Sequence, residues 1–468
     1  MSKKFAIFTY GCQMNRYDTE TISGYLEGED YERCEDFQKA DLILLNTCSI
    51  RDKAEQKVFS HLGRLSKLKK SKPTLKIGVC GCFATREGKA ISKRQPAVDL
   101  VFGTQNIAKL PQLLGQMARG RVVDVEPIEP DYSDLAPMKR EEGPRAWVSI
   151  ARGCDNFCTF CVVPYTRGPE WSKPSRLVVE EVEDTVREGF KEITLLGQNV
   201  NSYGKKTPGD VTFGGLLRRL EEVEGLERIR FMTSHPKDCD NDMIEAIRDC
   251  TKVCEHLHLP VQSGSDEVLR RMERGYTVDE YLSKVSLFRE QVPRGVLTSD
   301  IILGFPGETD RDFEDTLRVI EEAKYDNIYQ FKYSPRPGTP AFDMEGEVPE
   351  EVKMERFDAV CRLQQRITEE AHEDLEGKVV EVMVEMAVAG NSDAGRDSGE
   401  GVFSSLQISS PPKRFTGRSR GNLRVQFLVE EISPRPGDVV EVEILRGGTH
   451  LLEGISPVGA AIMGEGAL

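Results

Sequence analysis

The chain of 468 residues lacks long apolar stretches, and it contains few cysteines. No segment approaches the roughly 20 consecutive apolar residues that a membrane-spanning helix needs. The N-terminal residues MSKKFAIFTYGC contain neither the apolar core of a secretory signal nor an Arg/Ser-rich transit segment. Only 12 residues are cysteine, far too few for a disulfide scaffold. We therefore expect a cytoplasmic protein without a membrane segment, in which clustered thiols are first of all metal or redox ligands.

Net positive charge is lacking as well. The 63 Lys and Arg residues are outnumbered by 78 Asp and Glu, which gives a formal net charge of −15. This balance argues against a general nucleic-acid coat, although a local basic patch on an acidic body still attracts phosphate. With 38% hydrophobic and 30% charged residues, the composition suits folded domains. At roughly 150 residues per domain, the length predicts about three of them.

Residues 1–120 alternate between apolar strands, each followed by a cysteine-bearing turn, and polar helices. The expected strands are Phe5–Thr9, Asp41–Asn46 and Ile77–Cys80, and the expected helices include Tyr17–Glu27 and Arg51–Leu68. Near-continuous apolar strands separated by helices predict a doubly wound parallel sheet, so the fold class is α/β. Residues 121–145 are rich in Pro and charge and are expected to form a linker.

Residues 146–376 show a second alternation and predict a partial (βα)6 TIM-like barrel, which is open relative to the eight-unit form. The expected strands are Trp147–Ala151, Glu192–Leu196, Arg228–Thr233, His256–Val261, Thr298–Leu303 and Asn327–Lys332. The expected helices include Arg176–Glu188, Asp279–Glu290, Asp310–Ala323 and Pro349–Glu376. Within residues 377–468, strand signals at Val379–Met386, Asn422–Leu428 and Val439–Leu445 predict a small antiparallel β-barrel. The Gly/Ser/Asp-rich residues 387–412 are expected to be a flexible excursion from it.

Three thiols within eight residues give the sharpest signal. Cys154, Cys158 and Cys161 have the spacing C-x3-C-x2-C just after an expected strand. Thiolates are the usual ligands of iron–sulfur clusters, and three of them leave one iron of a [4Fe–4S] cluster open. A structural zinc site needs a fourth Cys or His, and the next ten residues, VVPYTRGPEW, offer none. The spacing therefore favours a cluster over zinc or a chance grouping.

A second trio is dispersed along the chain. Cys12, Cys48 and Cys82 each follow the carboxyl end of an expected parallel strand, and these ends share one edge of a sheet. We expect them to converge and to hold a second open cluster, against the alternative of three unrelated buried cysteines. Cys80, inside its strand, is expected to be a core residue.

The first trio, with the aromatic Phe160 before its last cysteine, resembles the motif of the radical S-adenosylmethionine (SAM) superfamily. With both trios, the chain resembles the radical SAM methylthiotransferases, which add a C-terminal TRAM domain. The segments 158–168, 195–204, 234–236 and 259–265 resemble the tRNA-modifying branch of that family. The likeness covers roughly residues 5–385 and resumes near Phe415, while the Gly/Ser-rich segment departs from the compact TRAM pattern.

This resemblance implies methylthiolation of C2 of N6-isopentenyladenosine at position 37 of tRNA. One SAM would supply the methyl group and another the 5′-deoxyadenosyl radical, with two [4Fe–4S] clusters. The implied partners are the tRNA anticodon stem-loop, SAM and an external electron donor such as flavodoxin or ferredoxin, and a monomer is expected. The alternatives are the same chemistry on threonylcarbamoyladenosine or on a ribosomal-protein aspartate. A different class of protein, a two-cluster electron carrier, is disfavoured by the long central barrel and the basic C-terminal segment.

Several polar residues fall at or just past expected strand ends, where they would contact SAM or the target base, or simply be polar loop residues. They are Gln198, Asn199, Ser234, His235, Gln262, Ser263 and Tyr333. Gly304 permits close backbone approach, and the resemblance places its strand near the adenine of SAM. Phe160 is a further candidate for SAM contact. Arg167 and Arg176 are candidates for substrate phosphate contact or for simple solvation.

An acid-free basic segment near the C-terminus is the strongest candidate for RNA contact. It contains Lys413, Arg414, Phe415, Arg418, Arg420 and Arg424. Cations interleaved with an aromatic residue on a β-barrel suit phosphate contact with some base stacking. We expect replacement of Arg418 and Arg420 by Ala to weaken tRNA binding and to flatten its salt dependence.

Overall fold

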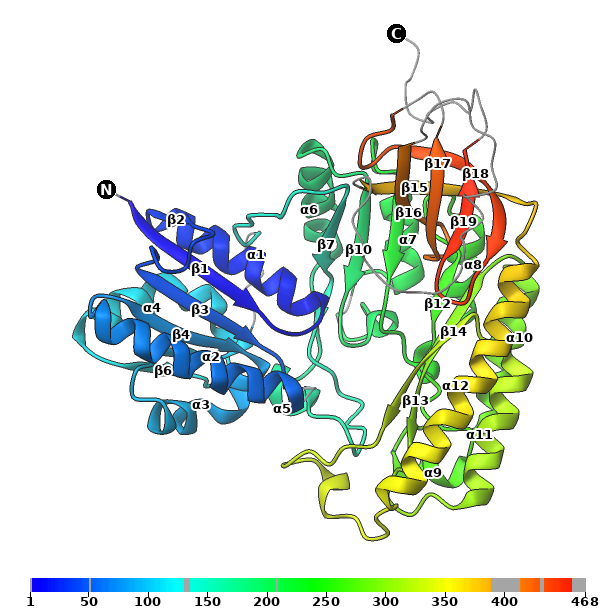
Figure 1. Ribbon diagram of the computed structural model, residues 1–468, viewed down its shortest axis with the longest axis horizontal. Helices are drawn as coiled ribbons and strands as arrows, with labels where there is room; N and C mark the ends of the chain where they lie inside the picture. The colour runs from blue at the N-terminus through cyan, green and yellow to red at the C-terminus, as the bar shows by residue number, and fades with distance from the viewer. Residues whose placement is uncertain are drawn as a thin grey trace.

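The computed structural model describes residues 2–49, 52–129, 135–207, 209–388, 413–429 and 433–456, and only the backbone of residues 52–56. Three bodies follow one another along the chain (Figure 1). A sheet with helices on both faces comes first, a larger α/β body lies in the centre, and a small β-barrel packs on one end of that body. Among the described helices, none combines the length and the apolar character that a bilayer crossing requires.

The N-terminal domain is a parallel sheet with the strand order β2-β1-β3-β4-β5-β6. Its strands are β1 (Lys3–Thr9), β2 (Tyr31–Arg33), β3 (Leu42–Thr47), β4 (Lys76–Gly81), β5 (Leu100–Phe102) and β6 (Val122–Asp124). Its helices are α1 (Gln13–Gly28), α2 (Asp52–Ser71), α3 (Cys82–Arg94) and α4 (Leu110–Gln116), with the 3-10 segments η1 (Thr104–Lys109) and η2 (Met117–Arg119).

Alternation along β3 explains why both faces of this sheet are covered. Ile43 and Leu45 belong to a hydrophobic cluster with residues of α2 and α3, whereas Leu42 and Leu44 pack with residues of α1 and α4. The predicted doubly wound parallel sheet is therefore confirmed. Cys80 is fully buried in the second of these clusters, as expected of a core residue.

The central domain contains six parallel barrel strands in two sheets, β11-β10-β7 and β12-β13-β14. An isolated bridge from Ile229 to Val253 joins the two sheets. The strands are β7 (Arg145–Ser149), β10 (Glu192–Leu196), β11 (Arg228–Phe231), β12 (His256–His258), β13 (Val296–Leu303) and β14 (Asn327–Lys332), beside a small ribbon of β8 (Ala151–Arg152) and β9 (Trp171–Ser172). The predicted partial six-unit barrel is confirmed.

Helices cover the outside of this barrel and bury its apolar outer face. They are α6 (Ser175–Arg187), α7 (Phe213–Glu221), α8 (Asn241–Asp249), α9 (Asp266–Arg271), α10 (Val278–Gln291), α11 (Asp310–Ala323) and α12 (Glu350–Glu373). The short helix α5 (Val163–Arg167) instead contacts α3 and η1 of the N-terminal domain. Short 3-10 segments are η3 (Val200–Ser202), η4 (Pro236–Asp238) and η5 (Pro340–Asp343). The capping boxes at Thr277 and Thr309 fix where α10 and α11 begin, because each side chain satisfies a backbone N–H that has no partner within the helix.

The C-terminal domain is a closed barrel with the strand order β15-β16-β17-β19-β18. Its strands are β15 (Val379–Ala387), β16 (Lys413–Ser419), β17 (Arg424–Val429), β18 (Val439–Gly447) and β19 (Leu452–Ile455). The predicted small barrel is confirmed, although its pairs are antiparallel except for β17 with β19.

One predicted domain boundary differs from the structure, and one predicted segment lies almost entirely outside the described residues. Val122–Asp124, within the predicted linker 121–145, forms the edge strand β6 and pairs with β5, so the N-terminal sheet extends beyond residue 120. A three-residue edge strand is too short to give a periodic signal. The predicted excursion 387–412 falls, apart from its first two residues, outside the described residues.

Candidate functional site

The three dispersed cysteines of the N-terminal domain lie at the carboxyl ends of adjacent strands. Cys12, Cys48 and Cys82 follow β1, β3 and β4, which are neighbours in the sheet. Cys12 is exposed, whereas Cys48 and Cys82 are buried. Burial raises the pKa of Cys82, and the charge of a Cys12 thiolate adds to that rise, so these two sulfurs are close enough to interact. The strand order thus places the three cysteines at one edge of the sheet, and their binding of a common cluster stays a prediction.

Two buried asparagines hold the turns that carry these cysteines. Asn15 Nδ2 donates to Asn46 Oδ1 at 3.1 Å, and Asn46 Nδ2 donates to the Asn15 carbonyl at 2.7 Å. Cys12 lies at the start of α1, and its Sγ is 3.5 Å from Asn15 Oδ1. Reciprocal bonds between the two turns fix the first two cysteines relative to each other.

A buried ion pair adjoins this trio. Arg167 Nη2 is 2.7 Å from Asp18 Oδ2, and both side chains are almost fully buried. Arg167 also interacts with Cys82 and Cys12, and its nearby charge opposes the rise that burial causes in the pKa of Cys82. Arg167 belongs to the central domain and Asp18 to α1, so the pair joins the two domains at the cysteine site.

The clustered trio lies in the loop between β8 and α5. Cys154 N–H donates to the Gly168 carbonyl at 3.2 Å, and Thr159 Oγ1 donates to the Arg271 carbonyl at 2.9 Å. Gly153 has a φ of +73°, and a Cβ there would lie 2.0 Å from the Pro169 carbonyl oxygen, so only glycine fits at this position. The loop is therefore anchored at both ends.

The three thiols of this loop interact with one another. Burial and the charges of Cys158 and Cys154 raise the pKa of Cys161 to about 12, and burial raises the pKa of Cys154. Arg274 Nη1 is 3.3 Å from Cys158 Sγ and brings a buried positive charge to the trio. Thiols that repel one another as thiolates suit a site where bound iron replaces their protons.

No group of three or more His, Cys, Asp or Glu side chains within the described ranges surrounds the position of a single metal ion. A cubane cluster differs from a single ion because each of its irons takes its own thiolate ligand. Three thiols in each trio match an open cluster, in which one iron has no protein ligand, whereas a structural zinc site takes four ligands.

Polar residues at the ends of β10 and β11 include three buried atoms that have no hydrogen-bond partner among the described residues. These atoms are Asn199 Oδ1, Ser234 Oγ and His235 Nε2. Burial lowers the pKa of His235 to about 2, so its ring is neutral. Gln198 Oε1 accepts from Gly153 N–H at 2.6 Å and so holds the cysteine loop. Buried polar atoms left without partners mark a place for a polar ligand.

The other predicted SAM contacts have partners within the protein. Ser263 Oγ is 3.2 Å from Ser265 N and 3.4 Å from Thr316 Oγ1, and Tyr333 Oη donates to the Ala341 carbonyl at 2.8 Å. Gln262 is buried with a φ of +71°, and its backbone joins β13 through a bridge to Ile301.

Gly304 and Phe160, two further candidates for SAM contact, also lie against other parts of the protein. At Gly304, with a φ of +71°, a Cβ would lie 2.3 Å from Lys353 Cγ, so the close approach that glycine permits here is that of α12. Phe160 packs against the cluster formed by Phe305, Tyr333 and their neighbours.

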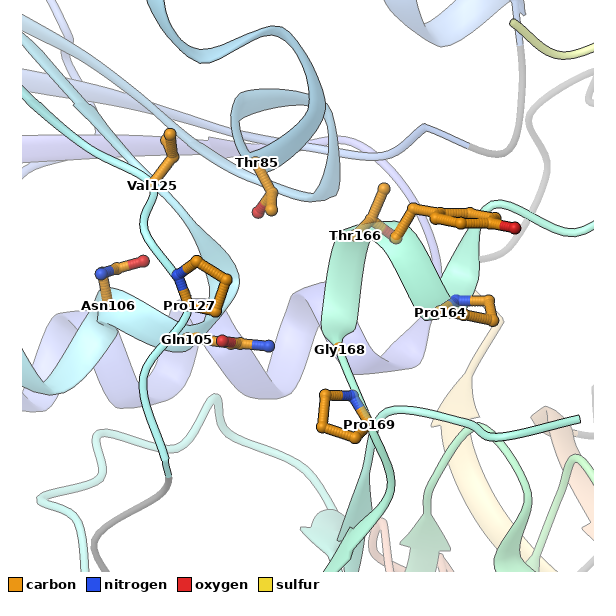
Figure 2. Close-up of a pocket in the computed structure, with 10 residues that line it drawn as sticks. Thr85, Gln105, Asn106, Val125, Pro127, Pro164, Thr166, Gly168 and Pro169 are labelled. Atoms are coloured by element: carbon orange, nitrogen blue, oxygen red, sulfur yellow. The ribbon is translucent and has the colours of Figure 1, made fainter. Parts of the chain in front are cut away.

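The short helix α5 links the two cysteine sites. It begins two residues after Cys161 and ends at Arg167, a span of roughly 6 Å at 1.5 Å per residue. Thr104 Oγ1 donates to the Thr166 carbonyl at 3.0 Å, and Gln105 Nε2 donates to the Arg167 carbonyl at 2.9 Å. Figure 2 shows Thr85 and Asn106 of the N-terminal domain facing Thr166 across a pocket of about 200 Å³. The two sites therefore lie on opposite sides of a docked junction.

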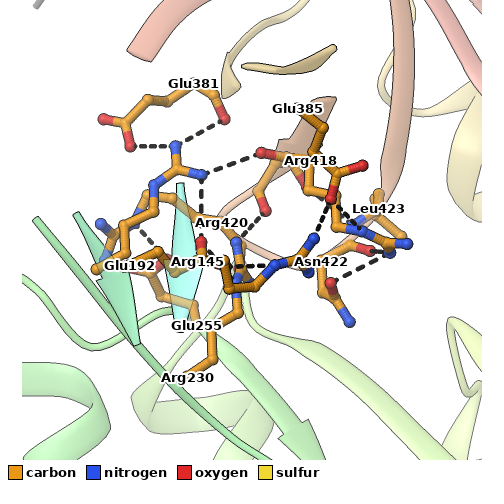
Figure 3. Close-up of polar contacts among 12 residues, drawn as sticks. Arg145, Glu192, Arg230, Glu255, Glu381, Glu385, Arg418, Arg420, Asn422 and Leu423 are labelled. Atoms are coloured by element: carbon orange, nitrogen blue, oxygen red, sulfur yellow. Dashed lines mark hydrogen bonds and ion pairs between the residues drawn. The ribbon is translucent and has the colours of Figure 1, made fainter. Parts of the chain in front are cut away.

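Two arginines of the basic C-terminal segment pair with glutamates of the same chain. Arg418 Nε lies 3.1 Å from Glu385 Oε1, and Arg420 makes a bidentate pair with Glu255 at 2.8 Å for both contacts (Figure 3). Arg230, at the base of the central barrel, donates to the Arg420 and Ser419 carbonyls at 2.6 and 2.8 Å. The geometry favours a docking role for Arg418 and Arg420 over contact with RNA.

The remaining residues of this segment are divided by strand alternation. Phe415 is buried in the barrel core, with its ring stacked 6.0 Å from Phe427 at 26°, so the structure directs it away from a base-stacking position. Lys413, Arg414 and Arg424 are exposed on the barrel surface. Of the six residues predicted to contact RNA, these three thus stay candidates.

Three functional candidates were missed or misjudged from the sequence. Arg274 and Asp18 carry no spacing signal, because single charged residues in polar helical segments are common. Arg167 was expected to contact phosphate or solvent, yet it is buried beside Cys12 and Cys82 of the second trio. Its position six residues after Cys161, on the junction helix, is visible only in three dimensions.

Comparison with known proteins defines the class. Residues 4–103 match the uncharacterized protein family UPF0004, and residues 148–320 match the radical SAM superfamily. A radical SAM methyltransferase from Kitasatospora setae shares the fold, with a TM-score of 0.57 at 16% identity over 73% of this chain and 75% of that one. The fold and the cysteine loop thus define a radical SAM enzyme, a class that uses SAM and a [4Fe–4S] cluster.

Two relatives define the family more closely. The chain is 45% identical to the tRNA-2-methylthio-N(6)-dimethylallyladenosine synthase of Acetivibrio thermocellus, over 97% of this chain and 90% of that protein. It is 46% identical to the protein of the same name from Pelotomaculum thermopropionicum, over 91% of this chain and 92% of that protein. The chain belongs to the family of tRNA-2-methylthio-N(6)-dimethylallyladenosine synthases.

Proposed function

We propose that this enzyme replaces the C2 hydrogen of N6-isopentenyladenosine at position 37 of tRNA with a methylthio group. One SAM would donate the methyl group, and a second SAM would be the source of the radical. The observation that carries this proposal is the presence of two separate thiol trios on either side of α5, in a chain nearly half identical to the synthases. A single-cluster enzyme would not need the second trio.

The loop trio, Cys154, Cys158 and Cys161, is proposed to hold the SAM-binding [4Fe–4S] cluster. When bound, this group and SAM supply the one-electron chemistry that can remove an unreactive aromatic hydrogen. Arg274 supports the assignment, because its buried guanidinium donates toward Cys158 and places a positive charge beside the proposed ligands. The hydrogen bond from Gly153 to Gln198 keeps the loop in place.

The second trio, Cys12, Cys48 and Cys82, is proposed to hold the auxiliary [4Fe–4S] cluster. Arg167 supports this assignment, because a buried cation beside Cys82 and Cys12 offsets the negative charge of thiolate ligands. Asp18 and the paired asparagines hold Arg167 and the turns in position without adding a further ligand.

Three buried atoms are proposed to bind the polar groups of SAM or of the target base: Asn199 Oδ1, Ser234 Oγ and His235 Nε2. Each gains a partner when a ligand with amino, carboxylate or hydroxyl groups enters, and an unpartnered buried polar atom costs about 1–3 kcal/mol. Lys413, Arg414 and Arg424 are proposed to contact phosphates of the anticodon stem-loop.

The remaining features of the account are proposals as well. We expect electrons from an external donor such as flavodoxin or ferredoxin, a monomeric enzyme and a cytoplasmic location. Reductive cleavage of SAM consumes one electron, which such a donor would supply.

The experiment that tests the proposal is nucleoside mass spectrometry of tRNA from a strain that lacks the gene. Loss of 2-methylthio-N6-isopentenyladenosine, with accumulation of N6-isopentenyladenosine, is the expected result. Complementation with the wild-type gene should restore the product, and complementation with Cys12→Ala or Cys158→Ala should not. Loss of a threonylcarbamoyladenosine derivative, or of the ribosomal-protein modification instead, would contradict the proposed substrate. Absence of SAM cleavage by reconstituted protein would favour an electron carrier.

A further inference from the structure

Strand β14 carries two large aromatic side chains that are unusually exposed for a strand inside an α/β domain. Tyr329 and Phe331 are 44% and 45% exposed, whereas their neighbour Ile328 is 4% exposed. Ile328 packs in the main core, and Gln330 Nε2 contacts Cys361 Sγ of α12 at 2.9 Å. Because side chains alternate along a strand, Tyr329 and Phe331 point away from α12, toward the interior of the barrel.

The neighbouring strands extend this inner face into a wall. In the β13–β14 register, Tyr329 is paired with Asp300 and Phe331 with Ile302, and both partners are only partly buried. The His258 ring of β12 lies 5.9 Å from the Tyr329 ring, edge to face, and its Nδ1 is 3.0 Å from Thr298 Oγ1. The other ring nitrogen of His258, Nε2, lies 3.6 Å from Asp300 Oδ1. Aromatic and aliphatic groups thus lie beside one carboxylate, which the histidine also contacts.

The wall adjoins the SAM end of the barrel. The same two strands continue to Gly304 and Tyr333, and Tyr333 belongs to the cluster against which Phe160 of the cysteine loop packs. Tyr333 lies just past the end of β14 and follows Phe331 by two residues, a rise of roughly 7 Å. A group resting on Phe331 and Tyr329 would therefore lie just inside the barrel from the cysteine loop.

We propose that the wall formed by Tyr329, Phe331 and Ile302 receives the N6-isopentenyl group of the substrate adenosine, an inference that rests on the proposed function. The isopentenyl group is a branched five-carbon chain without polar atoms, and its transfer from water to an apolar surface is favourable. The Asp300 carboxylate beside it can accept the hydrogen bond of the remaining N6–H. The wall thereby selects adenosines that already carry the group.

The test compares two synthetic anticodon stem-loop RNAs that differ only in the isopentenyl group of the target adenosine. Their dissociation constants are measured with the iron-reconstituted enzyme in its wild-type, Phe331→Ala and Tyr329→Ala forms. The wild type should prefer the isopentenylated RNA. Each variant should lose roughly tenfold or more of that preference, as expected when apolar contacts to a substrate group are removed, while affinity for the unmodified RNA stays within about twofold of wild type.

Two control variants separate recognition from general damage. Tyr329→Phe removes only the hydroxyl and should keep the preference. Met354→Ala removes a side chain that is also 45% exposed, on α12 and away from the wall, and should change neither affinity. Circular dichroism of each variant checks that it is folded.

Two results would overturn the inference while leaving the proposed function intact. In the first, wild-type enzyme forms the methylthio product yet binds both RNAs equally. In the second, Phe331→Ala and Tyr329→Ala keep the full preference or lose affinity for both RNAs alike. Failure of the proposed function is distinguishable, because the wild type would then form no methylthio product on the isopentenylated RNA.

Discussion

At the scale of single residues, Arg167 and Asp18 form a buried ion pair that joins two domains. The guanidinium is buried between a carboxylate and two thiols and comes from the opposite domain. Each charged group loses its contacts with water when the protein folds. A buried charge therefore needs a partner of opposite charge to offset this cost. The pair therefore fixes the N-terminal domain against the central barrel at the point where the proposed clusters face each other.

Removing one partner tests this role. Arg167→Ala should reduce the free energy of unfolding by about 3–5 kcal/mol, because it leaves the Asp18 carboxylate buried without compensation. The measurement is urea unfolding of the single variants and of the double variant with Asp18→Asn. Non-additive losses, with the double variant more stable than Arg167→Ala alone, are expected; purely additive losses would show that the two side chains act independently.

The sequence predicted the six cysteines because spacing and strand position are local properties. It did not predict Arg274 or Asp18, whose importance comes from burial between distant segments. It also assigned Arg418, Arg420 and Phe415 to RNA contact from charge and aromatic content alone. The partner strands decide which side chains of β16 face the core, the central barrel or solvent. Composition alone does not contain this information.

At the scale of elements, α1 and α6 meet through a buried cluster of charges. Arg140 lies 3.0 Å from Glu181 and 3.7 Å from Glu20, and all three side chains are nearly buried. Burial raises the pKa of Glu20 to about 7. The folded protein thus keeps the Glu20 proton up to about pH 7, whereas the unfolded chain releases it near its ordinary value.

This difference predicts a pH dependence of stability. Between the unfolded pKa of Glu20 and about pH 7, the folded state binds more protons than the unfolded state, so stability falls as pH rises. Glu20→Gln should remove part of that fall and raise the melting temperature by a few degrees at pH 8 relative to wild type. Scanning calorimetry from pH 5 to 8 measures it. The exposed Glu29→Gln is the matched control, and an identical slope in all three proteins would refute the prediction.

The docking of β16 on the base of the central barrel gives another element-scale prediction. Arg420 contacts Glu255 and the carbonyls of Thr251 and Val253, which hold the C-terminal barrel in place. Arg420→Ala should lower the free energy of unfolding by about 2 kcal/mol, which is in the range for hydrogen bonds to charged groups. It should also increase protease cleavage of the chain between the central barrel and the C-terminal barrel. Arg424→Ala should spare stability and lower the salt slope of tRNA binding by about one.

The opposite pattern would return the RNA-binding role to Arg420. A flattened salt slope in Arg420→Ala, with wild-type protease resistance, is the outcome that the docking geometry excludes. Limited proteolysis and salt-dependent binding on the same preparations separate the two roles.

Long elements were predictable and short ones were not. The predicted strand Glu192–Leu196 and helix Asp310–Ala323 match β10 and α11 residue for residue. The sequence missed β2, β5, β6, β9 and β19, which have only two to four residues, and it missed β16, whose polar residues face a partner domain. Hydrophobic periodicity reports burial over a long window, so it fails for these elements.

At the scale of the whole molecule, two parallel sheets present their carboxyl ends to a common junction. The N-terminal sheet offers one cysteine trio, the central barrel offers the other, and α5 spans the distance between them (Figure 1). The C-terminal barrel closes the opposite, amino-terminal end of the central barrel through Arg228 and Arg230.

The central claim is that each trio holds its own cluster, and iron content tests it most directly. Anaerobically reconstituted wild-type protein should contain about eight irons per chain. The triple variants with Ala at Cys12, Cys48 and Cys82, or at Cys154, Cys158 and Cys161, should each contain about four. About four irons in the wild type, or an undiminished content in either triple variant, would contradict the account.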